Sequence, residues 1–188
     1  MNYLISTVDK LTKQDIDYIQ TNYPVRYLKA SKLPNEQQFK ASVLAYILLI
    51  KLIGDFKEED VYYNEYKKPY IKNKPFFNIS HSGEFVAVVS DDKEVGVDIQ
   101  KIEEKNLKLM KFFNEDDQEY IKKDDSVNRF HEIWSIKEAA IKLMGTGLTT
   151  PLKDVIIYRG HVEINGMKIK SRCKLIPPGY SLCFCYLE

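Results

Sequence analysis

The sequence of 188 residues predicts an α+β fold. Apolar residues recur with helical spacing in residues 36–53 and 128–144, whereas residues 85–100 and the tail of the chain alternate as strands do. Helices and strands do not alternate regularly along the chain, so a doubly wound parallel sheet is not indicated. We expect two similar halves, residues 1–92 and 93–188, each with a long helix packed on a small antiparallel sheet. Only the similarity of layout indicates these halves, because no sequence period repeats.

Composition excludes several classes of protein. Lys plus Arg number 28 and Asp plus Glu number 27, so the formal net charge is +1, and 44% of residues are hydrophobic. These values exclude a disordered chain and a collagen-like fibre. A nearly neutral chain does not favour nucleic acid as a partner, since binding to phosphates usually needs a basic excess. The N-terminus has no signal-peptide pattern, and the most apolar stretch, residues 41–53, is too short to span a bilayer. We therefore expect a cytoplasmic protein with no membrane partner.

The two long helices are expected to be buried. In residues 36–53, one face carries apolar residues at helical spacing, namely Phe39, Val43, Tyr46, Ile47 and Ile50. Leucines fill most of the other positions, and Gly54 is expected to end this helix. The helix at residues 128–144 is expected to end at Gly145.

Two shorter helices are predicted from their caps. Thr12 precedes a helix expected at residues 13–20, and Asn114 precedes one expected at residues 115–122. Side-chain oxygens at such positions accept hydrogen bonds from the free N–H groups of the first helical turn.

The strands are predicted from alternation and turn residues. Residues 85–90 and 94–100 are expected to pair as a β-hairpin around the turn at residues 91–93. The tail is expected to form antiparallel strands, with an Asn165–Gly166 turn, at residues 155–158, 161–164, 167–175 and 180–187.

The cysteines lie late in the chain. Cys173, Cys183 and Cys185 are an odd number and do not indicate a disulfide framework. Cys183 and Cys185 share one face of a predicted strand with apolar neighbours, so we expect buried free thiols. Metal or redox chemistry is the alternative.

The predicted helix at residues 128–144 is otherwise apolar but carries a polar stripe at spacing i, i+4, i+7 and i+11, formed by His131, Ser135, Glu138 and Lys142. A bare buried charge costs several kcal/mol, so such a stripe needs a partner. An ion pair of Glu138 with Lys142 on a solvated seam is one interpretation. Lys137 projects into the apolar arc instead, and two lysines around one glutamate suit a phosphate beside a cation.

A second candidate cluster lies on the strand predicted at residues 94–100. Asp98 and Gln100 share one face, roughly 6.5–7 Å apart. Gly96 on that face leaves room for a ligand or for a close backbone. With a glutamate from a distant helix, these oxygens match the ligands that Mg²⁺ prefers, and Mn²⁺ is an alternative. Asp98 as the cap of a turn is the competing interpretation.

A third candidate cluster follows Lys68 and Pro69. The sequence FNISHSG at residues 77–83 places several hydrogen-bond donors at an expected bend. These donors can hold a phosphate or simply complete a turn.

Together, three segments resemble the motifs of one family. They are Lys68-Pro69 with FNISHS at 77–82, VGVD at 95–98 and WSIKEAAIK at 134–142. In this combination they are similar to the motifs of the 4′-phosphopantetheinyl transferases of the surfactin-synthetase type. The resemblance runs from residue 68 to residue 152, and the N-terminal third matches only loosely.

The resemblance implies a fold and an activity. The fold would be a pseudo-dimer of two similar α+β halves with the active site in the cleft between them. The activity would be Mg²⁺-dependent transfer of 4′-phosphopantetheine from coenzyme A to a serine of an acyl or peptidyl carrier protein, with release of 3′,5′-ADP. A monomer is expected. The alternative is a non-catalytic module on the same fold that binds coenzyme A or a carrier protein.

The resemblance also implies a metal site and a base. Asp98 and Glu138 match the metal ligands of the family, and Gln100 stands where many relatives carry Glu. Gln100 keeps a neutral oxygen but removes one charge, which keeps the non-catalytic alternative open. Asp117 matches a proposed basic carboxylate, and Glu138 is the other candidate base. For the neighbouring residues 115–116, an acidic helix start favoured by the helix dipole is the competing interpretation.

Cations and a histidine match the family's contacts with coenzyme A. Lys142 matches the lysine on the phosphates, and Lys137 belongs to the same motif. His81, with Ser80 beside it, matches the histidine at the 3′-phosphate. The other implied contacts are Lys68 and Pro69 near the adenine and, more weakly aligned at the phosphates, Lys40, Lys29, Lys32 and Arg26.

Residues 101–113 are a candidate docking surface for the carrier protein. Apolar residues in this segment are interleaved with Lys101, Lys105, Lys108 and Lys111. An amphipathic helix that packs its apolar side into the core is the competing interpretation. Both hold if the apolar face points inward and the lysines point outward.

Overall fold

The computed structural model describes residues 1–187, at position 148 the backbone only, and its strands form two antiparallel sheets and a hairpin. The first sheet has the order β1 (Asn2–Thr7), β5 (Phe85–Asp91) and β4 (Phe76–Ser82). The second sheet has the order β6 (Val95–Lys101), β10 (Tyr180–Tyr186), β9 (Met167–Ile176), β8 (His161–Ile164) and β7 (Ile156–Tyr158). The hairpin pairs β2 (Val61–Tyr63) with β3 (Pro69–Ile71).

The helices are α1 (Lys13–Asn22), α2 (Pro24–Ser31), α3 (Glu36–Ile53), α4 (Glu115–Lys123) and α5 (Ser126–Met144). Short 3₁₀ segments lie between the main elements: η1 (Val8–Lys10), η2 (Glu58–Asp60), η3 (Glu104–Phe112), η4 (Gly147–Thr149) and η5 (Leu152–Asp154). The predicted α+β class is confirmed. None of the helices within residues 1–187 is both long and apolar enough to cross a membrane.

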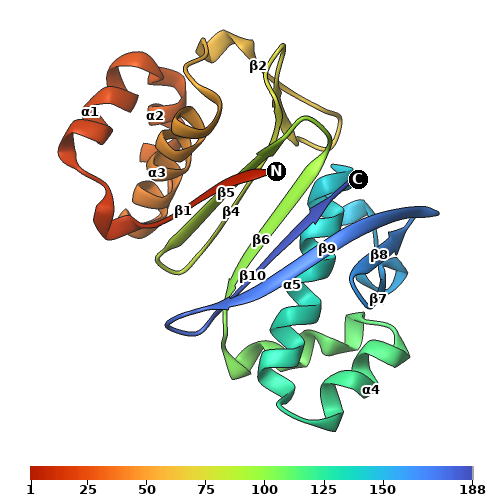
Figure 1. Ribbon diagram of the computed structural model, residues 1–188. Coiled ribbons are helices and arrows are strands. Elements are labelled where there is room, and N and C mark those ends of the chain that lie inside the picture. Colours follow the sequence, from red (N-terminus) through yellow and green to blue (C-terminus); the bar gives the residue numbers. More distant parts are fainter. Residues whose placement is uncertain (188) are drawn as a thin grey trace.

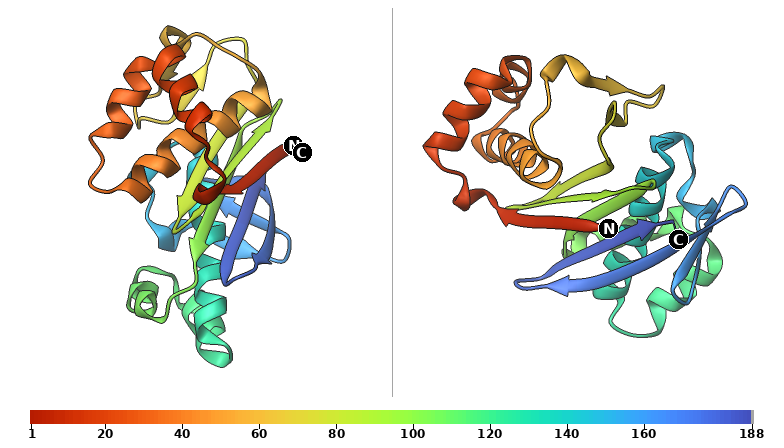
Figure 2. Two further views of the ribbon diagram at one scale, coloured as in Figure 1. Left: turned by 90° about the vertical axis from the view of Figure 1, so that its left-hand side faces the viewer. Right: turned by 45° about the horizontal axis from the view of Figure 1, so that its top comes forward.

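The elements stack as four layers: α3, the first sheet, the second sheet and α5 (Figure 1; Figure 2). In β5, Val86 and Val88 pack against α3, whereas Ala87 and Val89 face the second sheet. Helix α5 covers the opposite face of the second sheet. All strands of the first sheet lie within residues 1–92, and all strands of the second sheet lie within residues 93–188. The domain boundary between residues 92 and 93 stays a prediction.

Local patterns determined the helices as expected. Thr12 forms a capping box with Asp15 at the start of α1, and the Asn114 side chain accepts a hydrogen bond from the backbone N–H of Asp117 at the start of α4. Helix α3 ends at Gly54 and α5 at Gly145, both with positive φ, which glycine adopts without strain.

The predicted hairpin of residues 85–100 is wrong. Strands β5 and β6 form where expected, but β5 pairs with β1 and β4, whereas β6 pairs with β10. The apolar centre of β5 is fully buried, which requires a strand on each side and a layer on each face. Alternation identifies a strand but not its neighbour, so the chain passes from one sheet to the other at residues 92–94.

The cysteine prediction is also wrong for one pair. Cys173 on β9 and Cys183 on β10 lie directly opposite each other, with Cα atoms 4.1 Å apart, and form a disulfide. This pairing depends on strand register, which cysteine spacing alone does not give. Cys185 is a buried free thiol as expected, and burial raises its pKa.

Candidate active site

The centre of the site is the buried carboxylate of Asp98 on β6, whose side chain is 1% exposed. The Nζ of Lys142 on α5 lies 2.6 Å from Asp98 Oδ1. The Ser80 hydroxyl on β4 donates to the same oxygen at 3.0 Å, and Gln100 Nε2 donates to Oδ2 at 3.0 Å. Three elements from distant parts of the sequence therefore converge on one carboxylate, and two of the residues are the predicted candidates Asp98 and Lys142.

Gly96 lets α5 approach this strand closely. A Cβ atom at this position would lie 2.0 Å from the carbonyl oxygen of Ala139 and 2.7 Å from the backbone nitrogen of Leu143. Of the two interpretations of Gly96, the close backbone is therefore correct. The close contact brings the polar stripe of α5 against the Asp98 face of β6.

Glu138, one helical turn before Lys142, is the second carboxylate of the site. Its pKa is raised, first by burial and then by the charge of Asp98, whereas Lys142 opposes the shift. In the described part of the chain, no hydrogen bond or ion pair reaches its carboxylate. Two carboxylates and one lysine make up the cluster, so it has an excess of negative charge when both carboxylates are ionised.

This donor set fits a hard divalent cation that takes few ligands from the protein. Asp98 and Glu138 supply carboxylate oxygens, and the amide oxygen of Gln100 is free because only its nitrogen bonds to Asp98. Among residues 1–187, no group of three or more His, Cys, Asp or Glu side chains could hold a metal ion. Gln100 is not one of these residue types, and Mg²⁺ accepts a site with few protein ligands because it retains waters and substrate phosphates.

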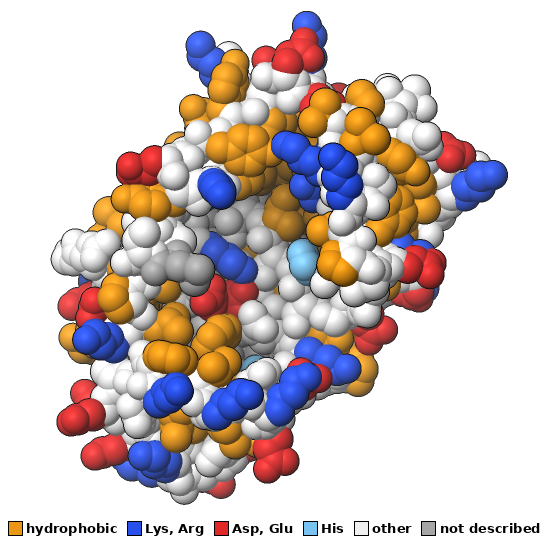
Figure 3. All heavy atoms as spheres, turned by 180° about the vertical axis from the view of Figure 1, so that it is seen from behind, with side chains coloured by type: hydrophobic (Ala, Val, Ile, Leu, Met, Phe, Trp, Pro, Cys, Tyr) orange, Lys and Arg blue, Asp and Glu red, His pale blue; other side chains and the backbone are white. Residues whose placement is uncertain are grey.

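A cavity of about 630 Å³ lies between α2, α3, β4 and the β2–β3 hairpin, and the charge of Lys142 reaches it at His81. His81 lines it, and its pKa is lowered by burial and by the charges of Lys142 and Arg26. On the face in Figure 3, basic, acidic and histidine side chains gather around a hollow. The cavity combines apolar walls with cations, and its lining includes Arg26, Lys29, Ser42, Tyr46, Tyr63, Pro69 and Phe77.

Arg26 is built into the wall of this cavity. Its guanidinium donates to the Ser42 hydroxyl at 2.7 Å and lies 4.6 Å from the centre of the Tyr46 ring. Lys29 lies 5.6 Å from the ring centre of Tyr63. The motif comparison matched Arg26 and Lys29 only weakly, and Ser42, Tyr46 and Tyr63 were missed because no spacing in the sequence links α2, α3 and the hairpin.

Several other predicted contacts lie elsewhere. Lys68 does not line this cavity: its Nζ donates to the carbonyl of Leu143 at 2.8 Å and pairs with Glu94, so it caps the C-terminal end of α5. Lys40 pairs with Glu36 at 2.6 Å along α3. Lys32 is exposed after the end of α2 and does not line the cavity.

Lys137 and Asp117 are not part of the Asp98 cluster. The Lys137 side chain is completely buried, its Nζ lies 2.6 Å from Asp117 Oδ2, and it donates to the carbonyls of Leu152 and Val155. Burial lowers the pKa of Lys137, and the pair with Asp117 opposes that shift. This geometry conflicts with the expectation that Lys137 contacts a phosphate and Asp117 acts as the base, because each is occupied by the other.

Comparisons with known proteins agree with these motifs. The family model described as the 4′-phosphopantetheinyl transferase superfamily matches residues 94–183. The chain is 34% identical over 134 residues to the 4′-phosphopantetheinyl transferase Sfp of Bacillus subtilis (strain 168), covering 64% of this chain and 60% of that protein. It is 30% identical over 171 residues to the 4′-phosphopantetheinyl transferase gsp of Aneurinibacillus migulanus, covering 86% and 66%.

A putative 4′-phosphopantetheinyl transferase of Haemophilus influenzae is 30% identical over 126 residues, covering 60% of this chain and 54% of that protein. The chain thus spans between about half and two thirds of the length of these curated relatives. The matched residues include both Asp98 and Lys142. The chain belongs to the 4′-phosphopantetheinyl transferase superfamily.

Proposed function

We propose that this protein transfers the 4′-phosphopantetheine moiety of coenzyme A to a serine of an acyl or peptidyl carrier protein and releases 3′,5′-ADP. The observation that carries the proposal is the Glu138 carboxylate, which has no hydrogen bond or ion pair within residues 1–187 and is influenced by the charges of Asp98 and Lys142. This cluster adjoins a cation-lined cavity in a chain with transferase relatives.

The proposal includes the finer description of the fold. We infer a pseudo-dimer of residues 1–92 and 93–188 with the active site in the cleft between the halves. Support comes from the matching positions of α3 and α5, each on the outer face of its own sheet. A cytoplasmic location and a monomeric state belong to the same proposal.

Coenzyme A would bind with its adenine and 3′-phosphate in the cavity and with its diphosphate next to Lys142. The cavity beside His81 offers apolar walls, including Pro69 and Phe77, for the adenine. Arg26, Lys29 and His81 supply charge for the 3′-phosphate, and phosphate binding favours the protonated form of the histidine. Lys142 is a point charge for the diphosphate.

Asp98, Glu138 and Gln100 would hold Mg²⁺, with Mn²⁺ as an alternative. When bound there, a divalent cation would neutralise charge on the diphosphate. Asp98 is a suitable ligand because hydrogen bonds from Ser80 and Gln100 already fix its orientation.

Glu138 is the candidate base for the transfer. The carrier serine oxygen attacks the phosphorus that bears the pantetheine arm, the bond from this phosphorus to the bridging oxygen breaks, and 3′,5′-ADP leaves with the electron pair. The serine proton passes to the Glu138 carboxylate.

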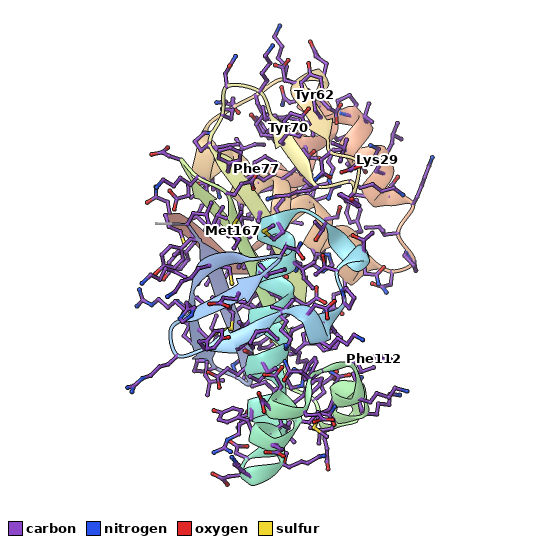
Figure 4. All side chains as sticks on the ribbon, turned by 90° about the vertical axis from the view of Figure 1, so that its right-hand side faces the viewer. Lys29, Tyr62, Tyr70, Phe77, Phe112 and Met167 are labelled. Carbon is purple, nitrogen blue, oxygen red and sulfur yellow. A yellow bond between two sulfur atoms is a disulfide. The ribbon has the colours of Figure 1, made fainter. Side chains whose placement is uncertain are left out.

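The carrier protein would dock on η3 and its flanks. Leu107, Leu109 and Met110 pack against the core that contains Phe113 and Phe130, so the apolar side of the segment points inward. Phe112 is 52% exposed, at the end of the molecule formed by η3 and α4 (Figure 4). The interleaved lysines can therefore meet an acidic partner.

The test is transfer to apo carrier proteins of the fatty acid, polyketide and nonribosomal peptide classes, each incubated with coenzyme A and Mg²⁺. Mass spectrometry should detect the addition of one phosphopantetheine arm to at least one carrier. Binding of coenzyme A without any gain in carrier mass would favour the non-catalytic binding module.

A further inference from the structure

The two sheets meet along a seam of side chains rather than a backbone ladder. Strand β6 lies beside β4 but belongs to the other sheet, so its N–H groups on that side have no strand partner. Three alternate side chains of β4 accept these hydrogen bonds: Asn78 from Val97 at 3.0 Å, Ser80 from Ile99 at 3.2 Å and Ser82 from Lys101 at 3.0 Å. The seam closes an otherwise open sheet edge.

Ser80 differs from its two neighbours because it also touches the site. Its hydroxyl accepts from Ile99 N–H and from Lys142 Nζ, the latter at 2.9 Å, and it donates to Asp98 Oδ1 at 3.0 Å. A serine hydroxyl has one donor and two acceptor positions, so all of its hydrogen-bonding capacity is used. The residue is only 5% exposed, which leaves no position for a phosphate.

Strand geometry separates Ser80 from His81. Successive side chains of a strand point to opposite faces, so adjacent residues do not reach the same group. His81 lines the cavity with Phe77, Asn78 and Ile79, whereas Ser80 does not line it and its hydroxyl accepts a hydrogen bond from the backbone of β6. The expectation that Ser80 accompanies His81 at the 3′-phosphate conflicts with the hydrogen bonds of its hydroxyl, which go to Asp98, Lys142 and Ile99.

We propose that Ser80 is a positioning residue that fixes Asp98 and Lys142 for the diphosphate of coenzyme A. The inference rests on the proposed function. Lys142 has a long flexible side chain that is 29% exposed, and its two contacts from different elements hold the ammonium in one place. Ser80 also accepts a hydrogen bond from the backbone of β6. It therefore holds Asp98 and Lys142 in a fixed position relative to the seam between the two sheets.

The experiment compares Ser80→Ala with a matched control, Ser82→Ala. Each variant removes one hydrogen bond of the seam, but Ser82 has no contact with the Asp98 cluster. Ser80→Ala should lower kcat for transfer about 10- to 100-fold, the usual cost of lost hydrogen bonds to charged groups. The KM for the carrier protein should not change. Ser82→Ala should keep kcat within about twofold, because surface changes of this kind cost little.

A double-mutant cycle on the affinity for coenzyme A isolates the contact. Combined with Lys142→Ala, Ser80→Ala should cost much less than it does alone, because the lysine it holds is gone. Ser82→Ala with Lys142→Ala should be additive. Ser80→Cys, which keeps the volume and weakens the hydrogen bonds, should be intermediate, and it replaces Ser80→Ala if that variant does not fold.

The affinities for coenzyme A and 3′-dephospho-coenzyme A distinguish a positioning role of Ser80 from a direct contact with the 3′-phosphate. Ser80→Ala should weaken both equally. A loss confined to coenzyme A would overturn the inference and return Ser80 to the 3′-phosphate, and equal effects of Ser80→Ala and Ser82→Ala would also overturn it. If the unaltered protein modifies no carrier, the proposed function fails, whereas the binding cycle still decides the role of Ser80.

Discussion

Two lysines of helix α5 each pair with a carboxylate from another element. The distance from nitrogen to oxygen is the same in both pairs, but their surroundings differ. Lys142 lies 2.6 Å from Asp98, and Lys137, five positions earlier, lies 2.6 Å from Asp117. The Lys137 ammonium is sealed by the carbonyls of Leu152 and Val155 and lies 5.5 Å from the centre of the Phe113 ring. The Lys142 side chain is instead 29% exposed, and its charge acts on His81 in the lining of the cavity.

Charge balance distinguishes the two pairs. Lys137 and Asp117 neutralise each other, and the remaining hydrogen bonds of the ammonium go to backbone carbonyls. Around Lys142, the second carboxylate of Glu138 leaves a negative excess, and burial together with the charge of Asp98 raises the pKa of Glu138. We call Lys137 and Asp117 the balanced pair, because their charges cancel and the pair joins two elements of the core. We call Asp98, Glu138 and Lys142 the unbalanced cluster, because its excess negative charge can attract a cation and, with it, a substrate.

The largest expected effect comes from removing a carboxylate of the unbalanced cluster. Asp98→Ala and Glu138→Ala should each lower kcat about 1,000-fold or more, because both charge neutralisation and proton removal depend on them. Chelation by EDTA should have the same effect on the unaltered protein. The measurement is mass spectrometry of the carrier protein over time.

The control for this prediction is Asp117→Asn, in the balanced pair. Transfer per folded molecule should persist in this variant, since Asp117 contacts Lys137 and not the cluster. Full activity in EDTA, or an equal loss of kcat in Asp117→Asn and Glu138→Ala, would contradict the distinction between the pairs.

Removing the other lysine should affect stability rather than catalysis. Lys137→Met leaves the Asp117 carboxylate buried without a counter-ion, which should lower the free energy of unfolding by about 3–5 kcal/mol. Lys137→Met combined with Asp117→Leu should recover most of the loss, because no unpaired charge remains. Urea unfolding measures both variants. Wild-type stability together with weak coenzyme A binding in Lys137→Met would contradict this prediction and indicate that Lys137 contacts the phosphates of coenzyme A.

The sequence predicts this helix well but not the neighbours of its side chains. Apolar spacing and Gly145 define α5, because helix formation follows local pattern and caps. A helical wheel gives the direction of both lysines around the axis and places Lys142 in the polar stripe and Lys137 in the apolar arc. Only the tertiary fold shows that η5 and α4 enclose the first, whereas β4 and β6 meet the second.

The same limit applies to the strands. The donors of FNISHS, expected at a bend, lie on strand β4, and the turn follows at residues 83–84; the alternating polar residues indicate a strand with one polar face. That β6 lies beside this strand was not predictable. Hydrogen bonds from backbone N–H groups to side chains leave no sequence pattern that differs from an ordinary polar surface. Asp98, Glu138 and Lys142 were identified because they belong to motifs, whereas Arg26 and Ser42 lie outside them.

A smaller effect should separate Lys142 from His81 within the site. His81→Ala should weaken coenzyme A more than 3′-dephospho-coenzyme A, because the histidine lies in the cavity assigned to the 3′-phosphate. Lys142→Ala should weaken both ligands equally, since both carry the diphosphate. A charge-assisted contact of about 1.5–3 kcal/mol corresponds to a loss of about 10- to 150-fold. Calorimetry measures the affinities, and equal sensitivity of His81→Ala to the two ligands would refute its role at the 3′-phosphate.

The smallest expected effect concerns the surface next to the balanced pair. Phe113, beneath the Lys137 ammonium, lies at the end of η3, so this pair anchors the segment that we assign to carrier docking. Lys108→Glu with Lys111→Glu should raise the KM for the carrier protein several-fold and leave the KM for coenzyme A unchanged. Reversed charges at the rim of an interface mainly slow encounter, so the defect should shrink as salt rises. A wild-type KM for the carrier at low salt would place the docking surface elsewhere and leave the balanced pair with a purely structural role.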